Sequence, residues 1–107
     1  HSSLVHIDST SFFKAIRSDL CFVLFYKSNS TACDNMEEKL SELARNKTYH
    51  SHFFKINTAS QCDSIIDLYN ISGVPNILIF KNGREQRRIM GVISYSNLQM
   101  IYQREIR

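Results

Sequence analysis

One apolar segment limits what this chain can fold into. Residues 20–26 read Leu-Cys-Phe-Val-Leu-Phe-Tyr, with no alternation between apolar and polar side chains. Such a run indicates a strand covered on both faces, and strands of this kind lie in the middle of sheets that helices cover on both sides. The segment is far too short to cross a bilayer, which takes roughly 20 apolar residues. We therefore expect an α/β protein with no direct membrane insertion in this part.

Apolar spacing and turn residues predict the other elements. Further strands are expected over residues 4–7, 53–57, 76–80 and 85–90, with Asn82-Gly83 as a type I′ hairpin turn between the last two. A first helix is expected to carry Phe12, Phe13 and Ile16 on one side. A long helix is expected from the polar break at 28–31 as far as Arg45, a shorter one around Ile65, Leu68 and Tyr69, and a last one over residues 96–102. The order is β-α-β-α-β-α-β-β-α.

This order implies a central mixed sheet with helices on both faces. A chain of 107 residues is enough for one domain, so we expect a single domain over residues 1–107 that can be part of a longer protein. The last strand contains Arg87 and Arg88, which suits a sheet edge, because charged side chains there discourage pairing with a second molecule.

Charge and cysteine count exclude several classes of protein. Thirteen basic and ten acidic side chains give a net charge of +3 without any nucleic-acid-binding module, so we expect no nucleic-acid partner. Three cysteines at unequal spacings fit neither a disulfide scaffold nor a structural zinc site. His50 and His52 are a metal candidate, but no Cys, Asp or Glu stands beside them, and we interpret them as exposed imidazoles at a strand edge. We predict no metal and no cofactor.

Several motifs together resemble those of the thioredoxin family. They are Val23–Tyr26, Ser30-Thr31-Ala32-Cys33 at the start of the long helix, Lys55–Asn57, Tyr69–Asn76, Phe80–Gly83 and Gly91. All three glycines and the single proline fall where that family uses Gly and Pro. The resemblance implies the thioredoxin fold, with a cis Val74–Pro75 bond facing the redox motif. It also implies that the backbone of Val74, together with Pro75, Ser30 and Thr31, contacts an extended segment of a partner polypeptide.

The redox motif departs from the family pattern of C-x-x-C. Ser30 stands where the family has its attacking cysteine, and an alcohol is a poor nucleophile without a dedicated base. We expect Ser30 to be the N-cap of the long helix instead. Cys33 matches the second cysteine, which in the family is largely buried and resolves a mixed disulfide that Ser30 cannot form. We favour a packed core thiol over any redox role for Cys33.

Two further family residues are missing. The buried acid of the family corresponds to Leu24, and the tryptophan before the motif corresponds to Asn29. Lys55 matches a family lysine near that acid, and without the acid we expect it to extend along the surface. Losses at three positions favour natural divergence over a single engineered Cys→Ser change. Cys21 and Cys62 are interpreted as packed thiols, although the sequence leaves a disulfide between them open.

The favoured hypothesis is a redox-inactive thioredoxin-like domain that binds a protein or peptide partner near the Val74–Pro75 loop. The enzyme alternative is a single-cysteine thiol–disulfide oxidoreductase in which Cys33 forms mixed disulfides with clients or glutathione. The nearby Asp34, Glu37 and Glu38 would disfavour the thiolate that this alternative needs. A third reading is a subunit that docks on a larger assembly through the same loop.

Three N-x-S/T sequons begin at Asn29, Asn46 and Asn70, compared with roughly one expected by chance from this composition. A thioredoxin-like domain with a degraded motif and sequons resembles the non-catalytic members of the protein disulfide isomerase family. That resemblance implies the endoplasmic reticulum lumen, and a glycan on Asn29 would obstruct the former active site. A cytoplasmic protein with unused sequons is the alternative.

Overall fold

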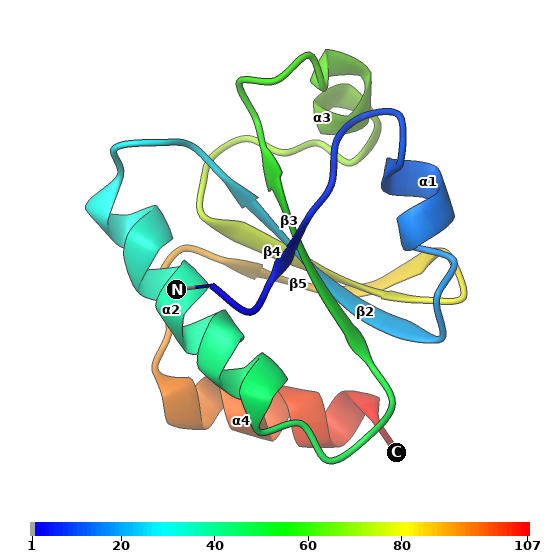
Figure 1. Cartoon of the computed structure of the whole chain (residues 1–107), viewed down its shortest axis with the longest axis vertical. Coiled ribbons are helices and arrows are strands. Elements are labelled where there is room, and N and C mark those ends of the chain that lie inside the picture. Colours follow the sequence, from blue (N-terminus) through cyan, green and yellow to red (C-terminus); the bar gives the residue numbers. More distant parts are fainter. Residues whose placement is uncertain (1) are drawn as a thin grey trace.

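The computed structural model describes residues 2–107, and Figure 1 shows their arrangement. In that part of the chain the elements follow the predicted order: β1 (Val5–His6), α1 (Phe12–Ala15), β2 (Leu20–Tyr26), α2 (Thr31–Arg45), β3 (His52–Asn57), α3 (Asp63–Leu68), β4 (Asn76–Lys81), β5 (Arg84–Met90) and α4 (Tyr95–Glu105). β1, β3 and β2 are parallel, whereas β4 and β5 are antiparallel to their neighbours. The predicted mixed sheet is therefore confirmed.

The central strand β2 has the two-sided cover that its sequence predicts. In the sheet order β1-β3-β2-β4-β5 it lies in the middle. Its even-numbered residues Leu20 to Leu24 face a core that includes α2 and α4, and its odd-numbered residues Cys21 to Phe25 face a core that includes α1 and α3. Figure 1 shows the two helix pairs on opposite sides of the sheet. Each large apolar side chain buried in this way contributes roughly 1.5–3 kcal/mol, so β2 anchors both layers.

The faces of the two short helices differ from prediction. Phe12 in α1 and Ile16 at its C-cap are buried, but Phe13 is 45% exposed. Phe13 lies about 100° around the helix axis from Phe12, so it cannot share a face with both of the others. In α3, Ile65 is buried while Leu68, at the last helical position, is 59% exposed. Helices of four and six residues bury one narrow face only.

β5 lies at the sheet edge, as predicted, but its arginines make contacts within the chain. Arg87 Nε is 3.1 Å from Glu105 Oε2 in α4. Arg88 Nε is 2.7 Å from Glu85 Oε2, and Arg88 Nη2 donates to the carbonyl of Tyr69 at 2.8 Å. Consecutive strand residues point to opposite faces, so the two arginines connect the edge strand to both layers.

The turn between β4 and β5 is the predicted hairpin. Asn82 and Gly83 have φ of +53° and +85°, and a type I′ turn requires positive φ at both positions.

None of the helices within residues 2–107 has the length and apolar character to cross a membrane.

Candidate functional site

The S-T-A-C motif and the proline loop lie at the same end of the sheet. β2 and β4 are antiparallel, with Phe25 opposite Asn76, so the residues after β2 and the residues before β4 leave the sheet together. Asn76 is also opposite Met90, which brings the end of β5 to this place. The predicted partner-binding residues, Ser30, Thr31, Val74 and Pro75, therefore gather at one end of the molecule.

Ser30 is the N-cap of α2, as predicted. Its backbone is extended, with φ −122° and ψ 115°, and its Oγ accepts the N–H of Cys33 at 3.2 Å. This bond satisfies one of the N–H groups that the first turn of a helix leaves unpaired. No basic side chain within residues 2–107 hydrogen-bonds to this hydroxyl. The arrangement suits a helix cap and lacks the base that would activate a nucleophile.

Cys33 is buried in the first turn of α2. It is 1% exposed, whereas the neighbouring Thr31 and Ala32 are exposed. A thiol at this depth meets a bulky polypeptide only if the first turn of α2 moves. The side chain therefore has the position of a packed core thiol.

The Val74–Pro75 peptide bond is cis, as predicted. Pro75 is buried and Val74 is half-buried. The carbonyl of Pro75 accepts the N–H of Gly91 at 2.9 Å, so the residue that follows β5 fixes the proline loop. Gly91 has a φ of +79°, a value that L side chains rarely adopt.

Asn76, directly after the proline, is 2% exposed, and its side-chain Oδ1 has no hydrogen-bond partner among residues 2–107. A buried acceptor left in this way costs about 1–3 kcal/mol. The sequence offered no signal for it, since an asparagine at a strand start is ordinarily exposed.

A groove and an apolar pair flank the proline loop. The groove has a volume of about 400 Å³ and is lined by Lys27, Thr58, Ile66, Ile71, Ser72, Gly73 and Val74. On the β5 side, Met90 is 66% exposed and Val92 is exposed as well. The loop thus lies between a groove that contains one cation and a pair of exposed apolar side chains. Sequence reasoning missed Met90 and Val92, because it assigned Met90 only to an edge strand.

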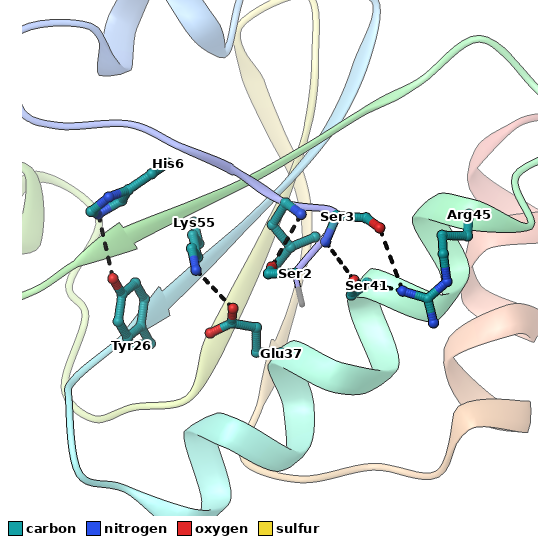
Figure 2. A network of polar contacts seen from close by, with 9 residues as sticks. Ser2, Ser3, His6, Tyr26, Glu37, Ser41, Arg45 and Lys55 are labelled. Carbon is teal, nitrogen blue, oxygen red and sulfur yellow. Dashed lines mark hydrogen bonds and ion pairs between the residues drawn. The ribbon is translucent and has the colours of Figure 1, made fainter.

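Lys55 has an acidic partner, contrary to prediction. Its Nζ is 2.7 Å from Glu37 Oε2 in α2, and the two side chains are 19% and 21% exposed. Figure 2 shows this pair beside Tyr26, whose ring centroid is 5.7 Å from Lys55 Nζ and whose hydroxyl lies 3.4 Å from His6 Nε2. Leu24 is fully buried, so the acid comes from α2 and not from the position where the resemblance places it.

The ionisation of Glu37 reflects its place beside Lys55. Burial opposes the charge, but hydrogen bonds from Lys55 and Ser2 and the positive charge of Lys55 outweigh it. The pKa of Glu37 therefore lies below its ordinary value of 4.5. The pair connects α2 to β3 next to the motif.

The other cysteines are packed thiols, as predicted. Cys21, Cys33 and Cys62 are all buried, and none forms a disulfide within the described residues. Burial raises the pKa of Cys21 to about 12, and it raises the pKa of Cys62 as well. The Cys62 thiol also donates to the carbonyls of Asn57 and Thr58, at 3.6 and 3.5 Å.

His50 is exposed, as predicted, whereas His52, the first residue of β3, is half-buried, contrary to prediction. Residues 2–107 contain no group of three or more His, Cys, Asp or Glu side chains placed to hold a metal ion. The three sequon asparagines, Asn29, Asn46 and Asn70, are exposed.

Comparison with known proteins agrees with this geometry. The model of the thioredoxin family, described as "Thioredoxin", matches residues 3–104. The chain belongs to the thioredoxin family. Proteins of this family commonly bind protein substrates. A chloroplastic M-type thioredoxin from Spinacia oleracea is 32% identical to this thioredoxin-family chain over 66 residues, which are 62% of this chain and 36% of that protein. The chain spans about a third of the length of that curated relative.

Solved structures share the thioredoxin fold. A mutant thioredoxin from Halobacterium salinarum aligns with a TM-score of 0.82 and 18% identity, over 94% of this chain and 88% of that one. Mitochondrial thioredoxin 3 from Saccharomyces cerevisiae, in its oxidised form, aligns with a TM-score of 0.81 and 19% identity, over 95% of both chains.

Proposed function

We propose that this chain is a redox-inactive thioredoxin-like domain that binds extended polypeptide segments around Val74 and Pro75. The observation that carries the proposal is the role of Ser30. Its hydroxyl stands at the position of the attacking cysteine and caps α2 by accepting the Cys33 N–H. The remaining motif cysteine is 1% exposed. Without an accessible nucleophile at this position, a thiol–disulfide exchange cycle has no first step.

Several features support polypeptide binding at the same place. An extended peptide gains affinity from main-chain hydrogen bonds and selectivity from pockets for its side chains. The groove beside Ser72–Val74 offers a pocket, and Met90 and Val92 offer apolar surface on the other side of the loop. A redox-inactive domain keeps these features while losing its nucleophile.

Catalysis is tested by insulin reduction with dithiothreitol. We expect the parent chain to give the uncatalysed rate, and Cys33→Ala and the matched control Cys62→Ala to give the same rate. Ser30→Cys recreates C-x-x-C and serves as the positive control for the assay. A parent rate above background that Cys33→Ala abolishes and Cys62→Ala preserves would overturn the proposal.

Binding is tested with a fluorescently labelled, reduced and alkylated polypeptide, which has no thiol to exchange. We expect Val74→Arg to weaken binding at least about tenfold, which corresponds to roughly 1.4 kcal/mol. Val5→Arg is the matched control, because Val5 is exposed on β1, away from the proline loop. Equal binding by Val74→Arg and Val5→Arg would show that the partner site lies elsewhere.

The second candidate function, a single-cysteine oxidoreductase using Cys33, requires that thiol to be accessible. Its burial counts against this function. Alkylation of the native protein across pH, followed by mass mapping of all three cysteines, separates the two. We expect Cys33 to stay unmodified until the domain unfolds. Fast labelling of Cys33 near neutral pH would make the oxidoreductase the better reading.

We further propose that this domain comes from a secretory-pathway protein of the protein disulfide isomerase family, in the endoplasmic reticulum lumen. The exposure of Asn29, Asn46 and Asn70 supports it, because a sequon is modified only where a glycan has room. The test is to secrete the chain from mammalian cells and to compare its electrophoretic mobility before and after endoglycosidase treatment. We expect a mobility shift that Asn→Gln changes remove one by one, and a secreted chain without glycans would favour the cytoplasmic alternative.

A further inference from the structure

A second hollow lies at the sheet edge formed by β1 and β3, far along the chain from the proline loop. β1 has two residues, which pair with Phe54 and Lys55 only, so the start of β3 has no strand outside it. The space beside it has a volume of about 300 Å³ and is lined by residues that include Ser3, Arg45, Lys47 and His52. We call it the β3-edge groove. It forms where the end of α2, the N-terminal segment and the start of β3 meet.

The cations of the β3-edge groove contact neutral acceptors. Arg45 Nη1 donates to Ser41 Oγ at 3.0 Å and to Ser3 Oγ at 3.4 Å, as Figure 2 shows. Lys47 Nζ donates to the carbonyl of Ser51 at 2.9 Å. In the described part of the chain, no carboxylate lies within 4.0 Å of Arg45 or Lys47. Lys55, Arg87 and Arg88, in contrast, each have a carboxylate within that distance. Within residues 2–107, neither Arg45 nor Lys47 is therefore held in an ion pair.

The imidazoles at this edge contact other rings. The ring of His52 is stacked with that of Phe54, at 6.2 Å between centroids and 6° between planes, and His50 lies edge-on to His52 at 5.0 Å. Burial lowers the pKa of His52, and the positive charges of His50 and Lys47 lower it further, whereas Asp19 acts in the opposite direction. The ring of His52 thus lies in a positive field.

We propose that the β3-edge groove binds an oxyanion of the sulfate or phosphate class. Arg45 and Lys47 supply positive charge, and the Ser3 hydroxyl, which accepts from Arg45, is left able to donate its own proton to an anion oxygen. Planar guanidinium groups suit such oxygens, and charge-assisted hydrogen bonds are roughly twice as strong as neutral ones. The site is separate from the proposed polypeptide surface and does not depend on it.

Binding and protonation of His52 are linked. An anion in the groove favours the protonated ring and raises the His52 pKa, and by reciprocity protonation tightens anion binding. Affinity should therefore rise as pH falls through the pKa of His52, which lies below 6.5. Sulfate is the suitable probe, because it remains a dianion throughout.

The test is a titration of the full chain with sodium sulfate at constant ionic strength, followed by amide and imidazole NMR. We expect saturable shifts over residues 45–54 and an upward shift of the His52 titration. Arg45→Gln and Lys47→Gln should each weaken binding about tenfold or more, as expected for one lost charge-assisted hydrogen bond. Lys47→Gln keeps the test valid if Arg45→Gln loosens the N-terminal segment.

Arg84→Gln is the matched control, because it changes net charge equally at an exposed position of β5. Shifts that do not saturate, or equal weakening by Arg84→Gln, would overturn the proposal in favour of diffuse attraction. A parallel titration with a phosphoserine peptide distinguishes the source of the anion. Tighter binding than sulfate indicates a group carried on a chain, and equal binding indicates a free ion.

Discussion

Removing the Glu37 carboxylate tests whether the ion pair with Lys55 stabilises the domain. The perturbation is Glu37→Gln, which keeps the shape of the side chain and removes its charge. Lys55→Met is the companion change, because it keeps the stem of Lys55 near Tyr26 while removing the ammonium group. The double variant completes a thermodynamic cycle, which isolates the interaction between the two side chains.

The expected magnitude follows from the geometry of the pair. Exposed ion pairs contribute about 0–1 kcal/mol, whereas breaking a fully buried pair costs about 3–5 kcal/mol. At 2.7 Å, and with about a fifth of each side chain exposed, this pair lies between the two cases. Water still reaches both groups and screens them. We expect Glu37→Gln to cost about 1–2 kcal/mol at pH 7 and the coupling energy to be about 1 kcal/mol.

Urea unfolding at several pH values provides the measurement. The folded-state pKa of Glu37 is lowered, so its stabilisation is present above the ordinary value of 4.5 and is lost as pH falls through the folded-state pKa. The stability difference between parent and Glu37→Gln should therefore shrink as pH falls below 4.5. A coupling energy of zero at pH 7, or a difference that does not shrink as pH falls below 4.5, would refute the reasoning.

Three further predictions concern single side chains. Ser30→Ala removes the cap of α2 and should lower the free energy of unfolding by about 1 kcal/mol, measured by urea denaturation, while Ser30→Asn should retain most of it. Cys21, whose pKa is raised to about 12, should resist alkylation at pH 9 in the native protein and react once urea unfolds it; native labelling there would contradict its burial. Asn76→Leu removes a buried acceptor that has no partner in residues 2–107, so it should raise the free energy of unfolding by about 1 kcal/mol in the same urea measurement. A lower free energy of unfolding would instead show that the amide has a partner such as water.

Much of the fold could be predicted because local patterns and the global fold agree. The unbroken apolar run of β2 specifies a central strand, since only two-sided cover removes that surface from water. Asn82-Gly83 specifies its turn through positive φ, and Ser30 specifies a helix start through its hydroxyl. These features depend on residues that are close in sequence.

The parts that could not be predicted depend on how distant elements meet. Whether Lys55 finds an acid depends on the position of α2 over β3, which places Glu37 within 2.7 Å, and no local pattern records that position. The partners of Arg87 and Arg88 likewise come from α4 and from the end of α3. The exposure of Met90 follows from its place at the end of the edge strand. Side-chain pairing between elements is thus set by packing, which the sequence alone does not display.

The contacts at both ends of the segment from Tyr69 to Pro75 have a kinetic consequence. Arg88 holds the carbonyl of Tyr69 at one end, and the Gly91 N–H holds the carbonyl of Pro75 at the other. The conformational entropy of ordering this segment is therefore lost during folding and not during association. A partner that docks here meets a pre-organised surface, so its association rate should depend on diffusion and orientation, at about 10⁵–10⁷ M⁻¹s⁻¹, and not on a slow loop rearrangement. Differences in affinity among partners would then appear as differences in residence time.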